Sequence, residues 1–435
     1  MDTSLYNQQL FSFLSASPTP FHCVAQMSRI LQQHGFTRLR EQQSWGQLSK
    51  GSYYVVRQQG AITAFTLGTD EKITDGFRII GAHTDSPCLQ LKPKPDVKTG
   101  SFHQLAVEVY GGSLLAPWFD RDLSIAGRVC VARDDGSIDV FLVDFARPLV
   151  TIPSIAIHLF REANSKPDIN QQKHLPPIIG QSVAKQLPDF TEILKDQMAR
   201  EHPEASGREI LGYDLFCYDH QGPIYTGVNN DFISAPRLDN LLSCHAGLTA
   251  LIQTDRTKNS ILFCSNHEEN GSLSAAGAQG SFISAVLERI IPEDGERRLA
   301  LASSFLISAD NAHATHPNYP EKTDPGHEIH LNKGPVIKIN ANQRYTSSGF
   351  SSAVYKQLCR ICAVDCQEFV MRSDLACGST IGPMTAARLG VNGVDVGAPT
   401  LGMHSIRELT GRRDPLLFQR PLVTFLTSDL PRSCS

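Results

Sequence analysis

The chain has 435 residues, of which 41% are hydrophobic, so a large folded core is possible and wholesale disorder is excluded. The 40 Lys and Arg residues against 44 Asp and Glu give a net charge of −4, which argues against a nucleic-acid partner because such proteins normally carry a basic excess. There is no apolar run of about 18 residues that would predict a membrane span. The first residues also lack the pattern of a secretory signal.

The first hundred residues mix helical and strand patterns. Residues 5–35 carry apolar side chains at helical spacing and predict one or two helices that stop near Gly35. The apolar run at 77–82 is typical of a buried strand and ends at His83. The Pro- and Lys-rich segment 91–96 predicts a solvated connector that leaves this domain.

The next part of the chain has the pattern of an antiparallel β module. Apolar and polar residues alternate between about 100 and 145, most clearly at 105–110 and 138–143, with turn residues between these runs. Residues 161–207 are polar and predict loops or a surface helix, and 213–218 is again strand-like.

From Asp239 onward, predicted helices and strands alternate, which favours a layered α/β domain. A helical stripe begins at Asp239, and further helices are expected at 274–291 and 380–389. The predicted strands lie at 261–265, 305–308, 335–339 and 391–396. Because the early strand at 77–82 fits this domain, we expect an α/β domain of residues 1–90 and 236–435, interrupted by an inserted β-rich domain of residues 91–235.

Imidazole and carboxylate side chains follow several of the predicted strands. In α/β sheets, ligands and catalytic groups collect at the carboxyl ends of the strands. Two imidazoles with several carboxylates form a mixed N and O donor set that suits Zn²⁺, Mn²⁺ or Co²⁺. The residues concerned are His83, Asp85, Asp239, Glu268, Glu269, Asp310 and His404.

The spacing suggests separate roles for these side chains. Asp239 stands alone at a helix start and could bridge two ions, whereas Asp85 lies two residues after His83 and could orient its imidazole. Of the adjacent Glu268 and Glu269, one can bind a metal while the other takes a proton from water. Each motif alone also fits a structural turn, a helix cap or a solvated loop, so only their joint placement favours a metal hydrolase.

The eleven cysteines indicate reduced thiols in a cytosolic protein. Cys359, Cys362 and Cys366, with Cys377 beyond, have a spacing that could bind an iron–sulfur cluster or zinc. Cys359, Cys362 and Cys366 are also spaced so that all three would lie on one face of a helix. We favour a buried helix face over a metal site.

Six segments resemble the aspartyl aminopeptidases and occur in the order found in that family. They span most of the chain from about 80 to 408, and several are six or more residues long. The segments are GAHTDSPC at 81–88, PRLDN at 236–240, HEENGS at 267–272, SADNAH at 308–313, GPVIK at 334–338 and MHSIRE at 403–408.

The resemblance implies a three-layer zinc-peptidase-like α/β domain interrupted by a β domain used in assembly. It also implies cytosolic tetrahedral dodecamers that remove N-terminal Asp or Glu from peptides. Two co-catalytic Zn²⁺ ions per subunit are implied, with Mn²⁺ or Co²⁺ as alternatives. His83 and Asp310 would hold one ion and Glu269 and His404 the other, with Asp239 bridging and Glu268 as general base.

The resemblance also places substrate-binding residues. Lys338 would supply the cation that an acidic side chain needs, and Tyr345 and His313 are similar assignments. His158 would reach into the site of a neighbouring subunit. From the residues alone, we favour a solvated strand-end lysine for Lys338 and a core histidine on an apolar strand for His158.

Two positions depart from the family pattern, and rival functions stay open. Asn270 stands where Val is expected, and Asn311 occupies a variable position. The rivals are a non-catalytic shell or peptide-binding protein on the same fold, an iron–sulfur redox protein, and a neutral aminopeptidase or deacylase. An intact ligand set argues against the shell protein.

Overall fold

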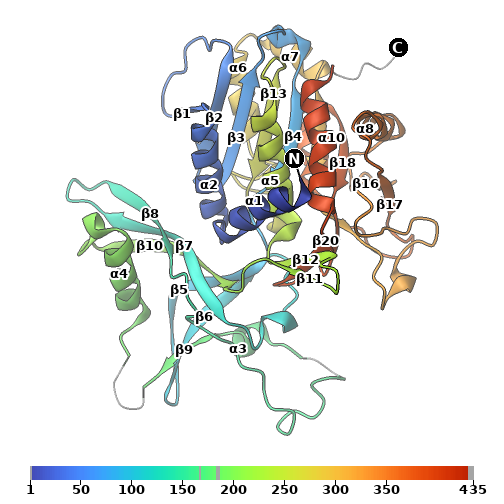
Figure 1. The fold of residues 1–435 in the computed structure, drawn as a ribbon. Coiled ribbons are helices and arrows are strands. Elements are labelled where there is room, and N and C mark those ends of the chain that lie inside the picture. Colours follow the sequence, from blue (N-terminus) through green and yellow to red (C-terminus); the bar gives the residue numbers. More distant parts are fainter. Residues whose placement is uncertain (1, 166–167, 183–186, 430–435) are drawn as a thin grey trace. The chain divides into compact units, whose positions relative to one another are not determined.

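The computed structural model describes residues 2–165, 168–182 and 187–429 (Figure 1). Two compact units make up the chain. The first contains Met1–Asp85, Pro223–Met403 and Glu408–Ser435, and the second contains Ser86–Gly222 and His404–Arg407. The second unit begins at Ser86, 5 residues before the expected boundary at 91, and the first unit resumes at Pro223, 13 residues before the expected boundary at 236. The short segment His404–Arg407, which also belongs to the second unit, was not expected.

The first unit is built on a nine-stranded mixed sheet in the described part of the chain, with the order β1-β2-β3-β13-β4-β14-β18-β16-β17 (Figure 1). The strands are β1 Thr37–Leu39, β2 Gly51–Arg57, β3 Ala61–Leu67, β4 Arg78–His83, β13 Ser260–Ser265, β14 Phe305–Ala309, β16 Val336–Ile339, β17 Gln367–Val370 and β18 Asn392–Gly397.

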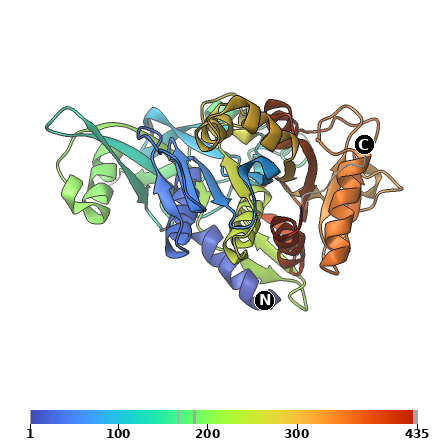
Figure 2. The ribbon, with the colours of Figure 1, turned by 90° about the horizontal axis from the view of Figure 1, so that it is seen from above.

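Helices cover both faces of this sheet and bury two separate apolar clusters, which gives the three layers seen in Figure 2. One face packs against α1 Thr3–Ser15, α2 Pro20–Gln33, α5 Leu238–Gln253, α8 Gly349–Ile361 and α10 Asp414–Thr427. The other packs against α6 Phe282–Ile290, α7 Asp294–Ala302 and α9 Ile381–Leu389. The expected layered α/β fold is confirmed.

The central strands of the sheet are parallel and buried along their whole length. β4 pairs in parallel with both β13 and β14, and β14 pairs in parallel with β18. Every residue of β4, β13 and β14 is buried, as their apolar runs predict for strands covered on both faces. Their carboxyl ends therefore meet at one edge of the sheet.

A smaller sheet completes the first unit, with the order β11-β12-β20-β19-β15 among the described residues. Its strands are β11 Ile224–Thr226, β12 Phe232–Ala235, β15 Ala312–His313, β19 Pro399–Leu401 and β20 Glu408–Gly411.

The second unit is a six-stranded antiparallel sheet, in its described part, with the order β8-β7-β10-β5-β6-β9 and its own apolar core. Its elements are β5 Cys88–Thr99, β6 Phe102–Tyr110, β7 Leu123–Ala132, β8 Ile138–Asp144, α3 Gln171–His174, β9 Ile178–Gln181, α4 Phe190–Glu201 and β10 Ile210–Asp219. The antiparallel β module that the alternation predicts is present.

Two expected elements are wrong. The segment 91–96 is not a solvated connector but part of β5, whose pairing with β6 shifts register between Leu91 and Asp96. The bulge accommodates the two prolines, which cannot donate to a regular ladder. The helix expected at 274–291 begins only at Phe282, because the preceding residues form tight turns, where a Cβ on Gly277 would lie 2.2 Å from the Ser272 carbonyl oxygen.

Among the described residues, none of the helices combines the length and the apolar character that crossing a membrane requires.

Candidate metal centre

Three neighbouring strands of the large sheet deliver the predicted polar side chains to one edge. His83 is the last residue of β4, Asp310 directly follows β14, and Glu268 and Glu269 lie in a short turn after β13. His83 pairs with Ser265 at the end of β13. The parallel register thus brings together residues that are more than 180 positions apart in the sequence.

His83 is 1% exposed and is oriented through its Nδ1 atom. Nδ1 lies 3.0 Å from the Asp85 carbonyl oxygen, so it carries the proton, and it is 3.4 Å from Asp85 Oδ1. The opposite nitrogen, Nε2, lies 3.4 Å from Asp310 Oδ1 and 4.0 Å from Asp239 Oδ2. Nε2 is therefore the nitrogen that can coordinate a cation.

The donor atoms of the first unit form two clusters that could each hold a metal ion. Within the described residues of this unit, His83 groups with Asp239 and Asp310, and also with Glu268 and Glu269, with all ligand atoms of a group within 4.8 Å of one another. His83 Nε2 and Asp310 Oδ1 are buried and have no hydrogen-bond partner in the described structure. Buried polar atoms rarely stay unsatisfied, so this pair fits a site for a cation.

Asp85 positions the turn that carries the two glutamates. The backbone N–H of Glu268 donates to Asp85 Oδ1 and that of Glu269 donates to Asp85 Oδ2, each over 3.1 Å. Asp85 itself is 1% exposed. One residue, Asp85, therefore orients the His83 ring through its carbonyl oxygen and holds the backbone of both glutamates through its carboxylate, as expected for a residue that orients metal ligands.

Two further residues, which were not predicted as site residues, hold the start of α5 around Asp239 in place. Glu408 Oε2 accepts the backbone N–H of Asp239 over 2.9 Å. Asn311 donates from Nδ2 to the carbonyl oxygen of Leu238 over 3.0 Å and to Thr400 Oγ1 over 2.8 Å. Both side chains are buried. Glu408 and Asn311 lie within the family-like segments, but no local pattern distinguishes them from surface residues.

Burial and charge perturb the acid–base groups of the cluster. Burial raises the pKa of Glu268 to about 7, with the charge of His83 opposing and the carboxylates of Asp310, Asp85 and Asp239 reinforcing the shift. Burial alone would lower the pKa of His83, but the adjacent carboxylates of Asp310 and Asp85 raise it well above its usual value. The cluster concentrates negative charge around one imidazole, which is an environment that binds cations.

Lys338 is buried beside Asp310 rather than solvated at a strand end. Its Nζ donates to Asp310 Oδ2 over 3.1 Å and to the Asn311 carbonyl oxygen over 3.0 Å, and it lies 5.3 Å from the centre of the Tyr345 ring. Burial raises the pKa of Asp310, but the Lys338 ammonium and His83 outweigh this effect and leave that pKa below its usual range. The interpretation of Lys338 as a solvated lysine is wrong.

Three further expected site residues are the histidines His404, His313 and His158. His404 belongs to the second unit, where its Nδ1 lies 3.1 Å from the Gly112 carbonyl oxygen, so Nε2 is again the nitrogen available to coordinate. His313 is exposed on β15, with its ring centre 5.8 Å from that of Phe369. His158 lies in an exposed turn of the second unit, so its interpretation as a core histidine on a strand is wrong.

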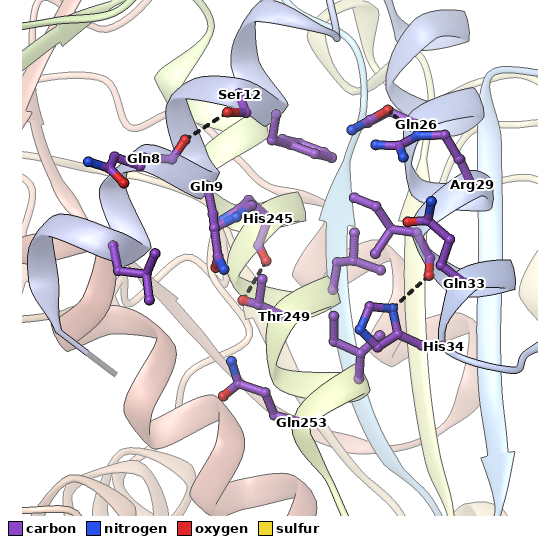
Figure 3. A pocket seen from close by; sticks show the side chains of 15 residues that line it. Gln8, Gln9, Ser12, Gln26, Arg29, Gln33, His34, His245, Thr249 and Gln253 are labelled. Atoms are coloured by element: carbon purple, nitrogen blue, oxygen red, sulfur yellow. Dashed lines mark hydrogen bonds between the residues drawn. The ribbon is translucent and has the colours of Figure 1, made fainter.

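A groove away from this cluster lies between α1, α2 and α5 and has a volume of about 530 Å³ (Figure 3). Its floor includes the buried His245 and Thr249, and its rim carries several glutamines, among them Gln8, Gln9 and Gln253. None of the described lining residues is Asp or Glu. The groove therefore lacks the carboxylates that a metal hydrolase needs, and the group around His83 stays the candidate metal centre.

A comparison with protein families shows which family the chain belongs to. Residues 13–425 match the profile described as Aminopeptidase I zinc metalloprotease (M18). The chain belongs to the M18 family of zinc metallo-aminopeptidases. It is 50% identical over 426 residues to a probable M18 family aminopeptidase 2 from Pseudomonas fluorescens strain SBW25, with 98% of this chain and 99% of the relative covered.

Solved structures of M18 proteins share the fold. A chain in the cryo-EM structure of the Ape4 and Nbr1 complex is 36% identical, with a TM-score of 0.93 over 98% of this chain and 86% of that chain. A chain of the mApe1 dodecamer from S. cerevisiae is 27% identical, with a TM-score of 0.83 over 97% and 96% of the two chains. The resemblance to this family of zinc peptidases is confirmed, and the chain is a peptide hydrolase of the metallo-aminopeptidase class.

Proposed function

We propose that this M18 protein is a dizinc aminopeptidase that removes N-terminal Asp or Glu from peptides. The observation that carries the proposal is the buried group of His83, Asp239 and Asp310, in which His83 Nε2 lies 3.4 Å from Asp310 Oδ1 and 4.0 Å from Asp239 Oδ2. Its place at the carboxyl ends of parallel strands is the usual place for ligands in α/β folds.

Five side chains would hold the two zinc ions. His83 and Asp310 would bind one ion, Glu269 and His404 the other, and Asp239 would bind both. Both histidines have Nδ1 within hydrogen-bond distance of a carbonyl oxygen, which leaves Nε2 as the ligand atom. Bound zinc would polarise the scissile carbonyl and make water more acidic.

Glu268 would act as the general base. A base works best when its pKa lies near the working pH, and burial holds the pKa of Glu268 at about 7. Its carboxylate would take a proton from the attacking water and pass it to the leaving amine. Asp85 would keep Glu268 aligned through the backbone hydrogen bond that spans 3.1 Å.

Lys338 would select an acidic N-terminal side chain. An ammonium group has three N–H donors, and Lys338 directs two of them to Asp310 and the Asn311 carbonyl. The third could bind the carboxylate of the substrate in a site that is nearly dry, since Lys338 is 3% exposed. Tyr345, beside Lys338, and His313 would line the same subsite.

We also propose that the chain self-associates. The mApe1 relative from S. cerevisiae forms a dodecamer, and we propose a tetrahedral dodecamer for this chain in the cytoplasm. The turn that carries His158 also exposes Ile155, Ile157 and Leu159, which is an apolar surface suited to contact with a second copy. His158 would complete the substrate site of that neighbouring copy.

The decisive test of the base is Glu268→Gln. The variant should retain zinc but lose several orders of magnitude in the turnover of Asp-p-nitroanilide, because an amide cannot accept the proton. Glu288→Gln, at an exposed position of α6, is the matched control and should leave turnover unchanged. Near-normal turnover by the Glu268→Gln variant would show that another group is the base.

Specificity requires a separate comparison. Wild-type protein should cleave Asp- and Glu-p-nitroanilides faster than Leu- or Lys-p-nitroanilides, and Lys338→Met should remove that preference. Equal rates on all four substrates with the wild type would favour a neutral aminopeptidase. A folded chain that binds no zinc would favour the non-catalytic shell protein.

A further inference from the structure

The three cysteines near the end of α8 have no part in the metal centre. Among the described residues, the groups that could hold a metal ion contain no cysteine, so the structure gives no support to an iron–sulfur site here. Cys359 is 1% exposed and belongs to the main apolar core, whereas Cys362 and Cys366 are only partly buried. The expected buried helix face is thus correct for Cys359 alone.

A tight chain reversal brings Cys366 back to Cys359. Helix α8 ends at Ile361, and Ala363 adopts a left-handed conformation with a φ of 52°. The N–H of Val364 then donates to the Cys359 carbonyl oxygen over 2.9 Å. This closure resembles the capping turns that commonly end helices, and it places Cys366, the residue before β17, alongside the helix it has just left.

The two thiols are neighbours with unequal exposure to solvent. Cys366 packs against the core cluster that includes Cys359, and the neighbouring Cys366 thiol raises the pKa of Cys359. Cys362 differs, because its thiol donates to the Cys359 carbonyl oxygen over 3.4 Å. Cys366 is therefore partly reachable by solvent, while Cys359 is enclosed in the core.

We propose that Cys366 and Cys359 form a peroxide-sensitive thiol pair, in which Cys366 is the reactive cysteine and Cys359 the resolving one. Oxidation would join the end of α8 to the start of β17 by a disulfide. The neighbouring strand β16, which pairs with β17, carries Lys338. The modification would therefore lie one strand away from the substrate-binding side of the proposed site, although it does not depend on the proposed function.

The chemistry balances with hydrogen peroxide as the oxidant. The Cys366 thiolate attacks one peroxide oxygen, the O–O bond breaks, and the released hydroxide takes up the thiol proton to form water. The Cys359 sulfur then attacks the sulfenic sulfur of Cys366, the S–O bond breaks, and the hydroxyl group leaves as water with the Cys359 proton. Two thiols and one peroxide thus give one disulfide and two waters.

The electrostatic surroundings favour this order of events. The neighbouring Cys359 thiol lowers the pKa of Cys366, and the positive charge of Lys356 adds to this effect. Reactive cysteines are typically partly exposed and close to a cation. The neighbouring Cys366 thiol and burial raise the pKa of Cys359, which is 1% exposed, so this thiol is unsuited to attack peroxide first.

Peptide mapping of the full-length protein tests the pair. Trypsin cleaves after Lys356 and Arg360, so Cys359 leaves in the peptide QLCR while Cys362 and Cys366 share ICAVDCQEFVMR. After brief treatment with hydrogen peroxide and alkylation of the remaining thiols, we expect the two peptides joined by a disulfide, with the alkyl group on Cys362. Dithiothreitol should separate them again.

Single variants distinguish the possible linkages. Cys362→Ser should still form the joined peptides, whereas Cys366→Ser should not, with near-wild-type thermal unfolding showing that each variant is folded. Cys130→Ser, in the second unit, is a control that should leave the linkage unchanged. Joined peptides in Cys366→Ser, or peroxide-treated wild type with all three thiols still alkylated, would overturn the proposal.

Discussion

The substitution Asp85→Asn tests whether this carboxylate organises the metal centre. Asp85 uses both oxygens to accept the N–H groups of Glu268 and Glu269 at 3.1 Å. Asparagine keeps the size but turns one oxygen into an NH₂ group, which faces an N–H donor and cannot accept from it. The change therefore removes at least one hydrogen bond to a charged group while leaving the packing intact.

A hydrogen bond to a charged group contributes about 1.5–3 kcal/mol, which corresponds to roughly a 10- to 150-fold loss in rate. We expect kcat for Asp-p-nitroanilide to fall within this range at saturating zinc. Asp70→Asn, at an exposed position after β3, is the matched control and should keep wild-type kcat. A folded Asp85→Asn variant with kcat within twofold of wild type would refute the assigned role of Asp85.

Three further predictions follow from the structure. Gly397→Ala should lower the free energy of unfolding by at least about 1–3 kcal/mol, and the thermal midpoint with it, because the new Cβ would lie 1.9 Å from the Asp310 carbonyl oxygen. Gly378→Ala is the control and should change neither quantity, because a Cβ at Gly378 would meet no atom within 4 Å. Burial lowers the pKa of His245 to about 3, whereas its pKa in the unfolded chain is about 6.5. Between these two values the unfolded chain binds a proton that the folded protein does not, so the free energy of unfolding should fall by up to about 1.4 kcal/mol for each pH unit below about pH 6. His245→Leu should flatten that slope in urea titrations, and an unchanged slope would contradict the assignment. Removal of zinc with EDTA should lower the thermal midpoint, since a ligand at 100 times its Kd stabilises by about 2.7 kcal/mol, and an unchanged midpoint would argue against a resident metal.

Much of the centre could be predicted because its residues follow strands with clear patterns. The apolar runs that become β4, β13 and β14 are buried on both faces, and parallel pairing forces their carboxyl ends together. His83 and Asp310 could therefore be placed at one edge of the sheet from the amino-acid sequence alone. The position of Asp239 at the start of α5 also follows from the helical stripe behind it.

The other features of the site and of the fold depend on contacts between residues far apart in the chain, which no local sequence pattern predicts. Glu408 lies 169 positions from Asp239 and Asn311 lies 73 positions from Leu238, and neither residue type is unusual at a loop or strand end. The prolines at 93 and 95 suggested a connector, but the register shift in β5 tolerates them. Lys338 looked solvated because the sequence does not show that Asp310 and Tyr345 enclose its ammonium group.

Crystallography with anomalous scattering at the zinc absorption edge tests the central claim most directly. The account predicts two zinc peaks per subunit. One should be bound by His83 and Asp310, the other by Glu269 and His404, and Asp239 should contact both. A single peak, or a His404 side chain that touches neither ion, would contradict the proposed pair of co-catalytic zinc ions.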